Sequence, residues 1–145
     1  MLLPINEFGF LPVPPVVHEL RLADLPGAFG AGSRRQELWQ GFLSFTDFLV
    51  TNTPFRELYL DGAFISAADT PDFVEVGIEL AKVDREILSR LKVPFLEEWS
   101  VRVRYYSPRR PEGFNFHEEF QRPDPDLRAS SLPAGTRKGY IRVRL

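Results

Sequence analysis

The fold is decided by two short segments, LYLDGAF at residues 58–64 and FVEVGIEL at residues 73–80. The first segment is apolar up to Asp61 and then reaches Gly62, a residue suited to a tight turn. In the second segment, valine, isoleucine and leucine occupy every other position, and Glu75 lies between two of them. A period of two predicts a strand with one face in the core. We therefore expect two strands that are joined through a turn at Gly62.

The apolar pattern predicts further elements on both sides of this pair. The clearest is a helix that opens at Ser33, where Ser33 and Gln36 make a capping-box pair, and stops near residues 51–53 before Pro54. Four apolar residues at helical spacing place one face of this helix in the core: Leu38, Phe42, Phe45 and Leu49. The remaining elements are a short helix over 82–91, a strand over 100–106, a short helix over 114–120 and a terminal strand over 140–145.

Residues 1–32 have a different character, because proline and glycine interrupt their apolar pattern. Pro12, Pro14 and Pro15 exclude a helix there and favour extended chain. We expect an ordered arm that lies over the rest of a single domain, residues 1–145. The predicted fold class is α/β in the broad sense, an α+β domain with a mixed sheet flanked by helices. The strand over 140–145 is expected at or near an edge of the sheet, where a second copy of the chain could pair with it as a homodimer.

The composition of the 145 residues, 43% hydrophobic and 26% charged, is that of a soluble globular protein. The absence of cysteine excludes structural disulfides, thiolate metal sites and cysteine nucleophiles. The first residues have neither a basic region nor a long apolar stretch, and no apolar run approaches the ~20 residues of a membrane span. We therefore expect a cytoplasmic protein that does not associate with a membrane.

The net charge of −2 conceals an asymmetry between the two parts of the chain. Residues 1–100 carry 8 Lys and Arg against 15 Asp and Glu, whereas residues 101–145 carry 10 against 5. The C-terminal third is therefore a basic segment on an acidic body. Such asymmetry can mark an anionic partner, but the more economical interpretation is that the basic segment pairs with the acidic body.

Short motifs follow one another in an order that resembles a known superfamily. They are Asn6, Gly9, Leu11, Pro12 and His18 in the opening, Asp61-Gly62-Ala63-Phe64 at the turn, Val76 on the next strand, and Lys138-Gly139-Tyr140-Ile141 near the end. Their order and spacing resemble those of the DNA polymerase β-like minimal nucleotidyltransferase superfamily, and a bacterial branch of it in particular. The resemblance covers nearly the whole chain.

This resemblance implies a site in which a Gly-Ser turn, here Gly62 and Ala63, cradles a triphosphate. It also implies two carboxylates at alternate positions on the next strand and a third on a later strand, which together bind divalent ions. The chain departs from that pattern. Alanine replaces serine at position 63, Phe73 replaces the first carboxylate, and Glu75 remains at the second. The later strand offers Arg102 and Arg104 on the corresponding face, and these guanidinium groups are expected to pair with Glu75 or Glu79.

The resulting hypothesis is a nucleotidyltransferase-like domain with a degenerate metal site that acts by binding, without a cofactor. Its nucleotide-binding candidates are Gly62, Ala63, Arg102 and Arg104, and its one metal-ligand candidate is Glu75. The expected target is a protein partner or a nucleotide held without turnover. The resemblance alone implies a setting in toxin–antitoxin or defence systems.

Two alternatives remain open from the sequence. In an active transferase that modifies a protein or RNA, Glu75 would act with Asp61, Asp69 or Asp72 to hold Mg²⁺. In an RNA or nucleotide-binding module, the arginines at 102, 104, 109 and 110 would act beside Tyr106, Phe114 and Phe116. A metal-binding or acid–base role for His117, which adjoins Glu118 and Glu119, is a weaker candidate because no second histidine is near it in the sequence.

Overall fold

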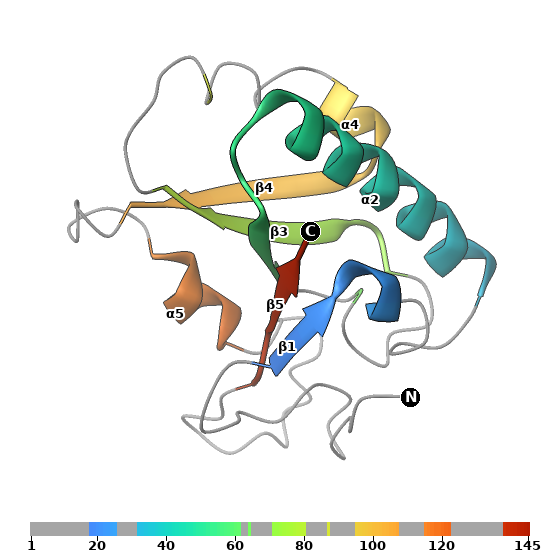
Figure 1. The fold of residues 1–145 in the computed structure, drawn as a ribbon. Helices are drawn as coiled ribbons and strands as arrows, with labels where there is room; N and C mark the ends of the chain where they lie inside the picture. The colour runs from blue at the N-terminus through green and yellow to red at the C-terminus, as the bar shows by residue number, and fades with distance from the viewer. Residues whose placement is uncertain are drawn as a thin grey trace, which may run out of the picture.

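The computed structural model describes residues 18–25, 32–61, 64, 71–80, 87, 95–107, 115–122 and 138–145. Within these residues the chain forms five strands and four helical segments (Figure 1). The strands are β1 (His18–Arg21), β2 (Glu57–Asp61), β3 (Val74–Glu79), β4 (Val101–Tyr106) and β5 (Ile141–Arg144). The helical segments are η1 (Leu22–Asp24), α2 (Ser33–Asn52), α4 (Phe95–Glu98) and α5 (Phe116–Phe120). The predicted helix over 82–91 lies outside the described residues, apart from Ile87.

The five strands form one mixed sheet in the order β1-β5-β2-β3-β4. Strand β2 runs antiparallel to both of its neighbours, β5 and β3, whereas β1 is parallel to β5 and β4 is parallel to β3. Helix α2 lies along one side of the sheet and α5 lies on the other (Figure 1). The predicted α+β class with a mixed sheet is therefore confirmed.

The core forms where the apolar face of α2 meets the apolar face of the sheet. The predicted helix face is confirmed, since four side chains of α2 are almost completely buried: Leu38, Phe42, Phe45 and Leu49. The sheet contributes the alternate positions of its central strands, which are Leu58, Leu60, Val74, Val76, Ile78, Ile141 and Val143. Alternation therefore leaves the opposite face of β2, β3 and β4 for polar side chains and for α5.

The start of α2 differs from the predicted capping box. Ser33 is the first helical residue, and Gly32 occupies the N-cap without a side-chain hydrogen bond. The backbone carbonyl of Gly32 accepts a hydrogen bond from the Gln36 N–H at 2.9 Å. The helix begins one residue too early for the Ser33 hydroxyl to act as the cap. Its end at Asn52, before Pro54, agrees with the prediction.

Among the described strands, β1 and β4 form the two edges of the sheet, and the terminal strand lies next to β1. Strand β5 lies inside the sheet, between β1 and β2. The predicted position of residues 140–145 near an edge is therefore confirmed, although the strand is not the edge strand itself. Both sides of β5 are paired within the chain, so a second copy could not pair with β5 as we expected, and a homodimer stays a prediction. Residues 18–21, which we expected in an extended arm, cover β5 as a parallel strand. The rest of the predicted arm, residues 1–17 and 26–31, lies outside the described residues.

Helix α5 rests on the sheet at Gly77. A Cβ atom at Gly77 would lie 2.5 Å from two carbon atoms of the Phe116 ring, so the missing side chain provides the space that the ring fills. Phe116 and Phe120 are both buried. This contact fixes α5 over the polar face of β3.

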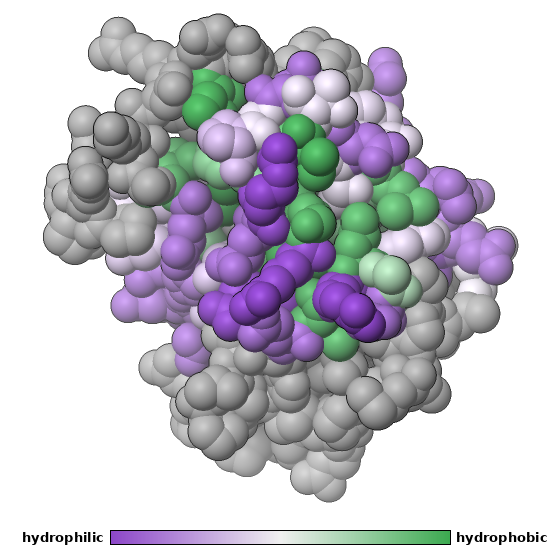
Figure 2. All heavy atoms as spheres, in the orientation of Figure 1, coloured by the Kyte–Doolittle hydropathy of each residue, from purple (hydrophilic) through white to green (hydrophobic). Residues whose placement is uncertain are grey.

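The surface on the side seen in Figure 1 alternates in character. Strongly hydrophilic side chains lie in front of the sheet, with apolar residues between them (Figure 2). In the described part of the chain, no helix combines the length and the apolar character that crossing a membrane requires.

Candidate functional site

Three charged side chains lie in one row across β2, β3 and β4. Asp61 is the cross-strand partner of Glu75, and Glu75 is the cross-strand partner of Arg102. Residues that face each other in neighbouring strands point to the same side of the sheet. The structure therefore brings together the carboxylates and the guanidinium that the sequence singled out on separate strands.

Asp61 is buried and already has a cationic partner. Its carboxylate forms an ion pair with the Lys138 ammonium, and both side chains are less than a tenth exposed. The Lys138 ammonium also donates a hydrogen bond to the carbonyl of Phe120 at 2.7 Å. Burial lowers the pKa of Lys138 to about 7, while the adjacent carboxylate works in the opposite direction. Asp61 therefore joins two motifs of the chain and is not a free metal ligand.

Arg102 lies between a carboxylate and an aromatic ring. Its Nη1 atom is 3.7 Å from the Glu75 Oε1 atom, which confirms the predicted pairing across the strands. Its guanidinium carbon lies 3.9 Å from the centroid of the Phe73 ring, a cation–π contact. The resemblance implies carboxylates at positions 73 and 75 and at a position on the later strand. These positions hold a ring, a carboxylate and a cation, and the cation contacts the other two.

The other predicted site residues are less closely associated. Asp72 is exposed, and its backbone carbonyl accepts a hydrogen bond from the Arg34 guanidinium, which also donates to the Pro71 carbonyl at 3.0 Å. Arg104 is exposed on the same face of β4 as Arg102. The candidates Gly62, Ala63 and Asp69 lie outside the described residues. Within the described ranges, no three His, Asp or Glu side chains gather in a way that could hold a metal ion.

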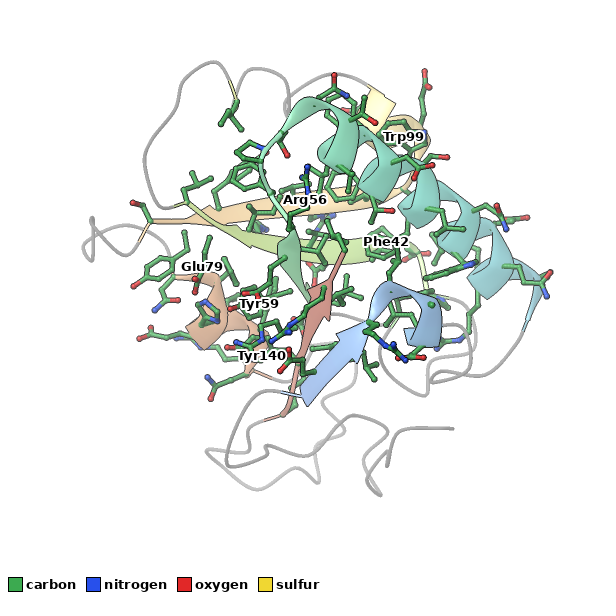
Figure 3. The ribbon with its side chains drawn as sticks, viewed as in Figure 1. Phe42, Arg56, Tyr59, Glu79, Trp99 and Tyr140 are labelled. Carbon is green, nitrogen blue, oxygen red and sulfur yellow. The ribbon has the colours of Figure 1, made fainter. Side chains whose placement is uncertain are left out.

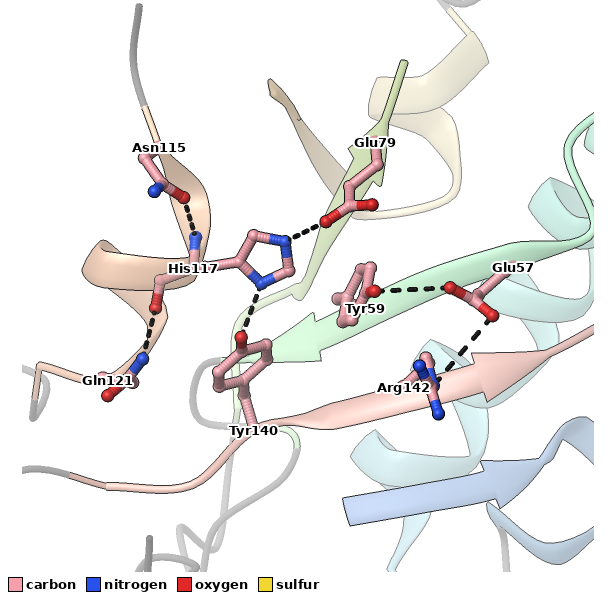
Figure 4. Close-up of polar contacts among 8 residues, drawn as sticks. All are labelled: Glu57, Tyr59, Glu79, Asn115, His117, Gln121, Tyr140 and Arg142. Atoms are coloured by element: carbon pink, nitrogen blue, oxygen red, sulfur yellow. Dashed lines mark hydrogen bonds and ion pairs between the residues drawn. The ribbon is translucent and has the colours of Figure 1, made fainter. Parts of the chain in front are cut away.

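A second polar cluster links β3, α5 and the residue that precedes β5 (Figure 4). His117 contacts Glu79 through Nε2 and Tyr140 through Nδ1, and both heavy-atom distances are 2.5 Å. Of the two carboxylates predicted as arginine partners, Glu75 therefore pairs with Arg102, whereas Glu79 pairs with His117. The ring of His117 thus contacts Glu79 and Tyr140, not the adjacent Glu118 and Glu119 that drew attention to it in the sequence. Its partners lie 38 and 23 residues away, so no local pattern could reveal them.

The chemistry of this cluster follows from its hydrogen bonds. A carboxylate only accepts, so the Nε2–H of His117 donates to Glu79. In the tautomer without a proton on Nδ1, that nitrogen accepts from the Tyr140 hydroxyl. Burial and the nearby Glu79 raise the pKa of Tyr140. Burial, followed by Glu79 and Glu57, raises the pKa of the neighbouring Tyr59 to about 12. Both phenols are thus favoured in their protonated form, and the two contacts of His117 join α5 to β3 and to the residue before β5.

Aromatic rings surround His117 and complete this anchor. The Tyr59 and His117 rings meet edge to face with centroids 4.6 Å apart. Tyr59, Glu79 and Tyr140 gather on the α5 side of the sheet, whereas Trp99 and Phe42 lie toward α2 (Figure 3). Phe116 is fully buried, so it is not available to the RNA- or nucleotide-binding surface on which the sequence placed it beside arginines. Tyr106 is half-buried against Phe116, and Phe114, Arg109 and Arg110 lie outside the described residues.

Strands β1, β5 and β2 are joined by a network of ion pairs. Arg142 lies 2.8 Å from Glu19 and 4.0 Å from Glu57, and Arg144 lies 2.5 Å from Glu19. The hydrogen bond from Arg142 lowers the pKa of the Glu19 carboxyl and raises the pKa of Arg142. Each of these pairs joins residues 101–145 to residues 1–100. The predicted pairing of the basic C-terminal third with the acidic body is confirmed.

These features define an α+β domain with a mixed five-stranded sheet, whose polar face carries a charged row and an anchored short helix. Residues 4–144 match the model of a family of unknown function, DUF6932. The chain belongs to this family. No curated protein and no solved structure matches the chain.

Proposed function

We propose that this protein is a nucleotidyltransferase-like domain that binds its target without catalysing metal-dependent nucleotidyl transfer. The observation that carries the proposal is the position of Arg102, whose guanidinium contacts both Phe73 and Glu75. Those are the positions at which the resembling superfamily has its paired carboxylates. A fixed organic cation therefore takes the place that the resemblance assigns to a divalent ion.

The charge balance of the row argues against Mg²⁺ binding. A hard divalent ion needs several oxygen ligands, usually including carboxylates. Glu75 already faces Arg102, and Asp61 is buried against Lys138. An incoming ion could displace the long Arg102 contact of Glu75, but Asp61 is held by the buried Lys138 ammonium, so the row would supply the ion with a single carboxylate. This is the reason for preferring binding over an active transferase that uses Glu75, Asp72 and Asp61.

The target that we propose is a protein partner or a nucleotide held without turnover. The setting in toxin–antitoxin or defence systems comes from the resemblance and belongs to the proposal. If the protein binds single-stranded RNA and this binding weakens steeply as the salt concentration rises, the target is RNA. Phosphate contacts show this dependence on salt.

Labelled nucleotide transfer tests the proposal. The protein is incubated with each of the four labelled nucleoside triphosphates and Mg²⁺ or Mn²⁺, alone and with a cell extract as acceptor. We expect no transfer above the level of the Glu75→Ala variant. Transfer that requires the metal and is abolished by Glu75→Ala would overturn the proposal. Thermal unfolding of both proteins establishes that the variant is folded.

A further inference from the structure

We propose that Arg102, seated on the Phe73 ring, forms the centre of a binding site for an oligophosphate anion that requires no metal. This inference rests on the proposed loss of the metal site and names the ligand class of the same row. It explains why a ring at position 73 and a guanidinium at position 102 occur together, since the ring provides the face on which the guanidinium lies.

The contact with Phe73 orients the guanidinium without using its N–H donors. The guanidinium carbon lies 3.9 Å from the ring centroid, and a cation–π contact leaves the N–H groups of the guanidinium able to donate to an acceptor. The side chain of Arg102 is 52% exposed, so an anion can reach it from solvent. The N–H groups of a guanidinium match the geometry of phosphate oxygens and can donate two parallel hydrogen bonds to one phosphate.

The Glu75 contact is weak enough to be exchanged. At 3.7 Å, the approach of Nη1 to Oε1 is an ion pair but is too long for a hydrogen bond. An ion pair of this kind at a partly exposed site contributes little to stability. A phosphate group carries more charge and forms shorter, charge-assisted hydrogen bonds, so it can replace Glu75 as the counter-ion of Arg102.

Arg104 extends the site along β4. It is exposed on the same face as Arg102, two residues further along the strand. Two residues of a strand span about 7 Å, so an anion with two or more phosphate groups can approach both guanidinium groups. Because a longer and more highly charged anion gives each guanidinium group its own phosphate, a triphosphate or diphosphate is favoured over a single phosphate.

Magnesium is expected to oppose this binding. A bound Mg²⁺ neutralises part of the phosphate charge that Arg102 attracts, and the row offers no free set of carboxylates to hold the ion. The ligand should therefore bind best in the presence of a chelator. This is the reverse of the metal requirement implied by the resemblance.

Isothermal titration calorimetry in EDTA tests the inference on the full chain. The ligands are inorganic triphosphate, a nucleoside triphosphate and inorganic phosphate, and the variants are Arg102→Ala and Phe73→Leu. The matched control is Arg21→Ala. Arg21 lies on β1, at the opposite edge of the sheet from β4. Its side chain is 81% exposed and is paired with Asp24. Thermal unfolding checks that each variant retains its fold.

We expect saturable binding of both triphosphates in EDTA, and weaker binding of inorganic phosphate. Arg102→Ala should weaken triphosphate binding at least about tenfold, which is the loss of one charge-assisted hydrogen bond, and Arg21→Ala should not. Phe73→Leu should weaken it severalfold, and excess Mg²⁺ should weaken it as well.

Three results would overturn the inference: no saturable triphosphate binding in EDTA, the same affinity for Arg102→Ala as for the Arg21→Ala control, or binding that appears only with Mg²⁺. These results are distinguishable from failure of the proposed function. Metal-dependent label transfer refutes the proposed function, whereas absence of both transfer and triphosphate binding refutes only the present inference.

Discussion

Lys138 and Asp61 form an ion pair in which the two side chains are only 6% and 7% exposed. One residue ends β2, before the turn at Gly62, and the other lies in the segment that leads into β5. The hydrogen bond from Lys138 to the Phe120 carbonyl ties α5 to the same point. The Asp61-Gly62 motif and the Lys138-Gly139 motif, which lie far apart in the sequence, are therefore in contact through this buried ion pair.

Removing the cation of this pair should destabilise the fold strongly. Lys138→Met leaves the Asp61 carboxylate buried without a partner, and we expect a loss of about 3–5 kcal/mol in the free energy of unfolding. Urea denaturation measures it. The double variant Asp61→Asn with Lys138→Met removes both charges and should recover much of the loss. A loss below about 1 kcal/mol for Lys138→Met would show that the pair is not buried in solution.

Gly77→Ala should disturb the packing of α5 against β3. The added methyl group would lie 2.5 Å from the Phe116 ring, so the ring or the helix has to move. We expect a destabilisation of roughly 1–3 kcal/mol, typical of an overpacked core. Combining Gly77→Ala with Phe116→Leu should cost less than the sum of the two single changes, because the smaller side chain makes room. Additive costs in denaturant titrations would contradict the contact.

The Tyr59 phenol should titrate well above an ordinary tyrosine. Its pKa is raised from 10.0 to about 12 by burial and by Glu79 and Glu57. A raised pKa means that the neutral form is favoured in the folded protein. The contribution to stability is therefore fully present below pH 10 and is lost as the pH rises toward 12. A pH titration followed by the absorbance of tyrosinate near 295 nm measures this pKa. Compared with the wild type, the Tyr59→Phe variant should lack a titration step near pH 12. If the missing step lies near pH 10 instead, Tyr59 is not buried as described.

Acid should weaken the ion pairs that join Glu19 of β1 to Arg142 and Arg144 of β5. Hydrogen bonding and charge from Arg142 and Arg144 lower the pKa of Glu19 below its ordinary value of 4.5. A lowered pKa means that Glu19 stabilises the fold above pH 4.5, and that this contribution fades as the pH falls through the folded-state value. The difference in stability between the wild type and Glu19→Gln should be present at neutral pH and shrink in acid. A difference that is unchanged at pH 3 would rule out an ionic origin.

The sequence predicted the elements whose signal is local. Alternation over 73–80 gave the buried face of β3 and placed Glu75 and Arg102 on one side of adjacent strands, where they pair. Apolar spacing gave the core face of α2 in the same way. Strand β1 was missed because four residues have little preference of their own and become a strand only by pairing with β5.

The remaining contacts depend on tertiary structure. The partners of His117 are far away in the sequence, and the meeting of Asp61 with Lys138 depends on how β5 and α5 fold onto β2. The position of β5 inside the sheet could not be deduced either, because an alternating apolar pattern occurs in edge strands and in interior strands alike. Spacing along the chain thus predicted which faces are polar, but not which polar groups meet.

Binding of Mn²⁺ tests the central claim most directly, because it asks whether the row can hold a divalent ion at all. Electron paramagnetic resonance of free Mn²⁺ is recorded as the protein is added, with Glu75→Ala as the comparison. We expect the free-ion signal to fall no further with the wild type than with the variant. A saturable loss of signal that disappears in Glu75→Ala would contradict the account, because it would place a carboxylate-bound metal where Arg102 lies.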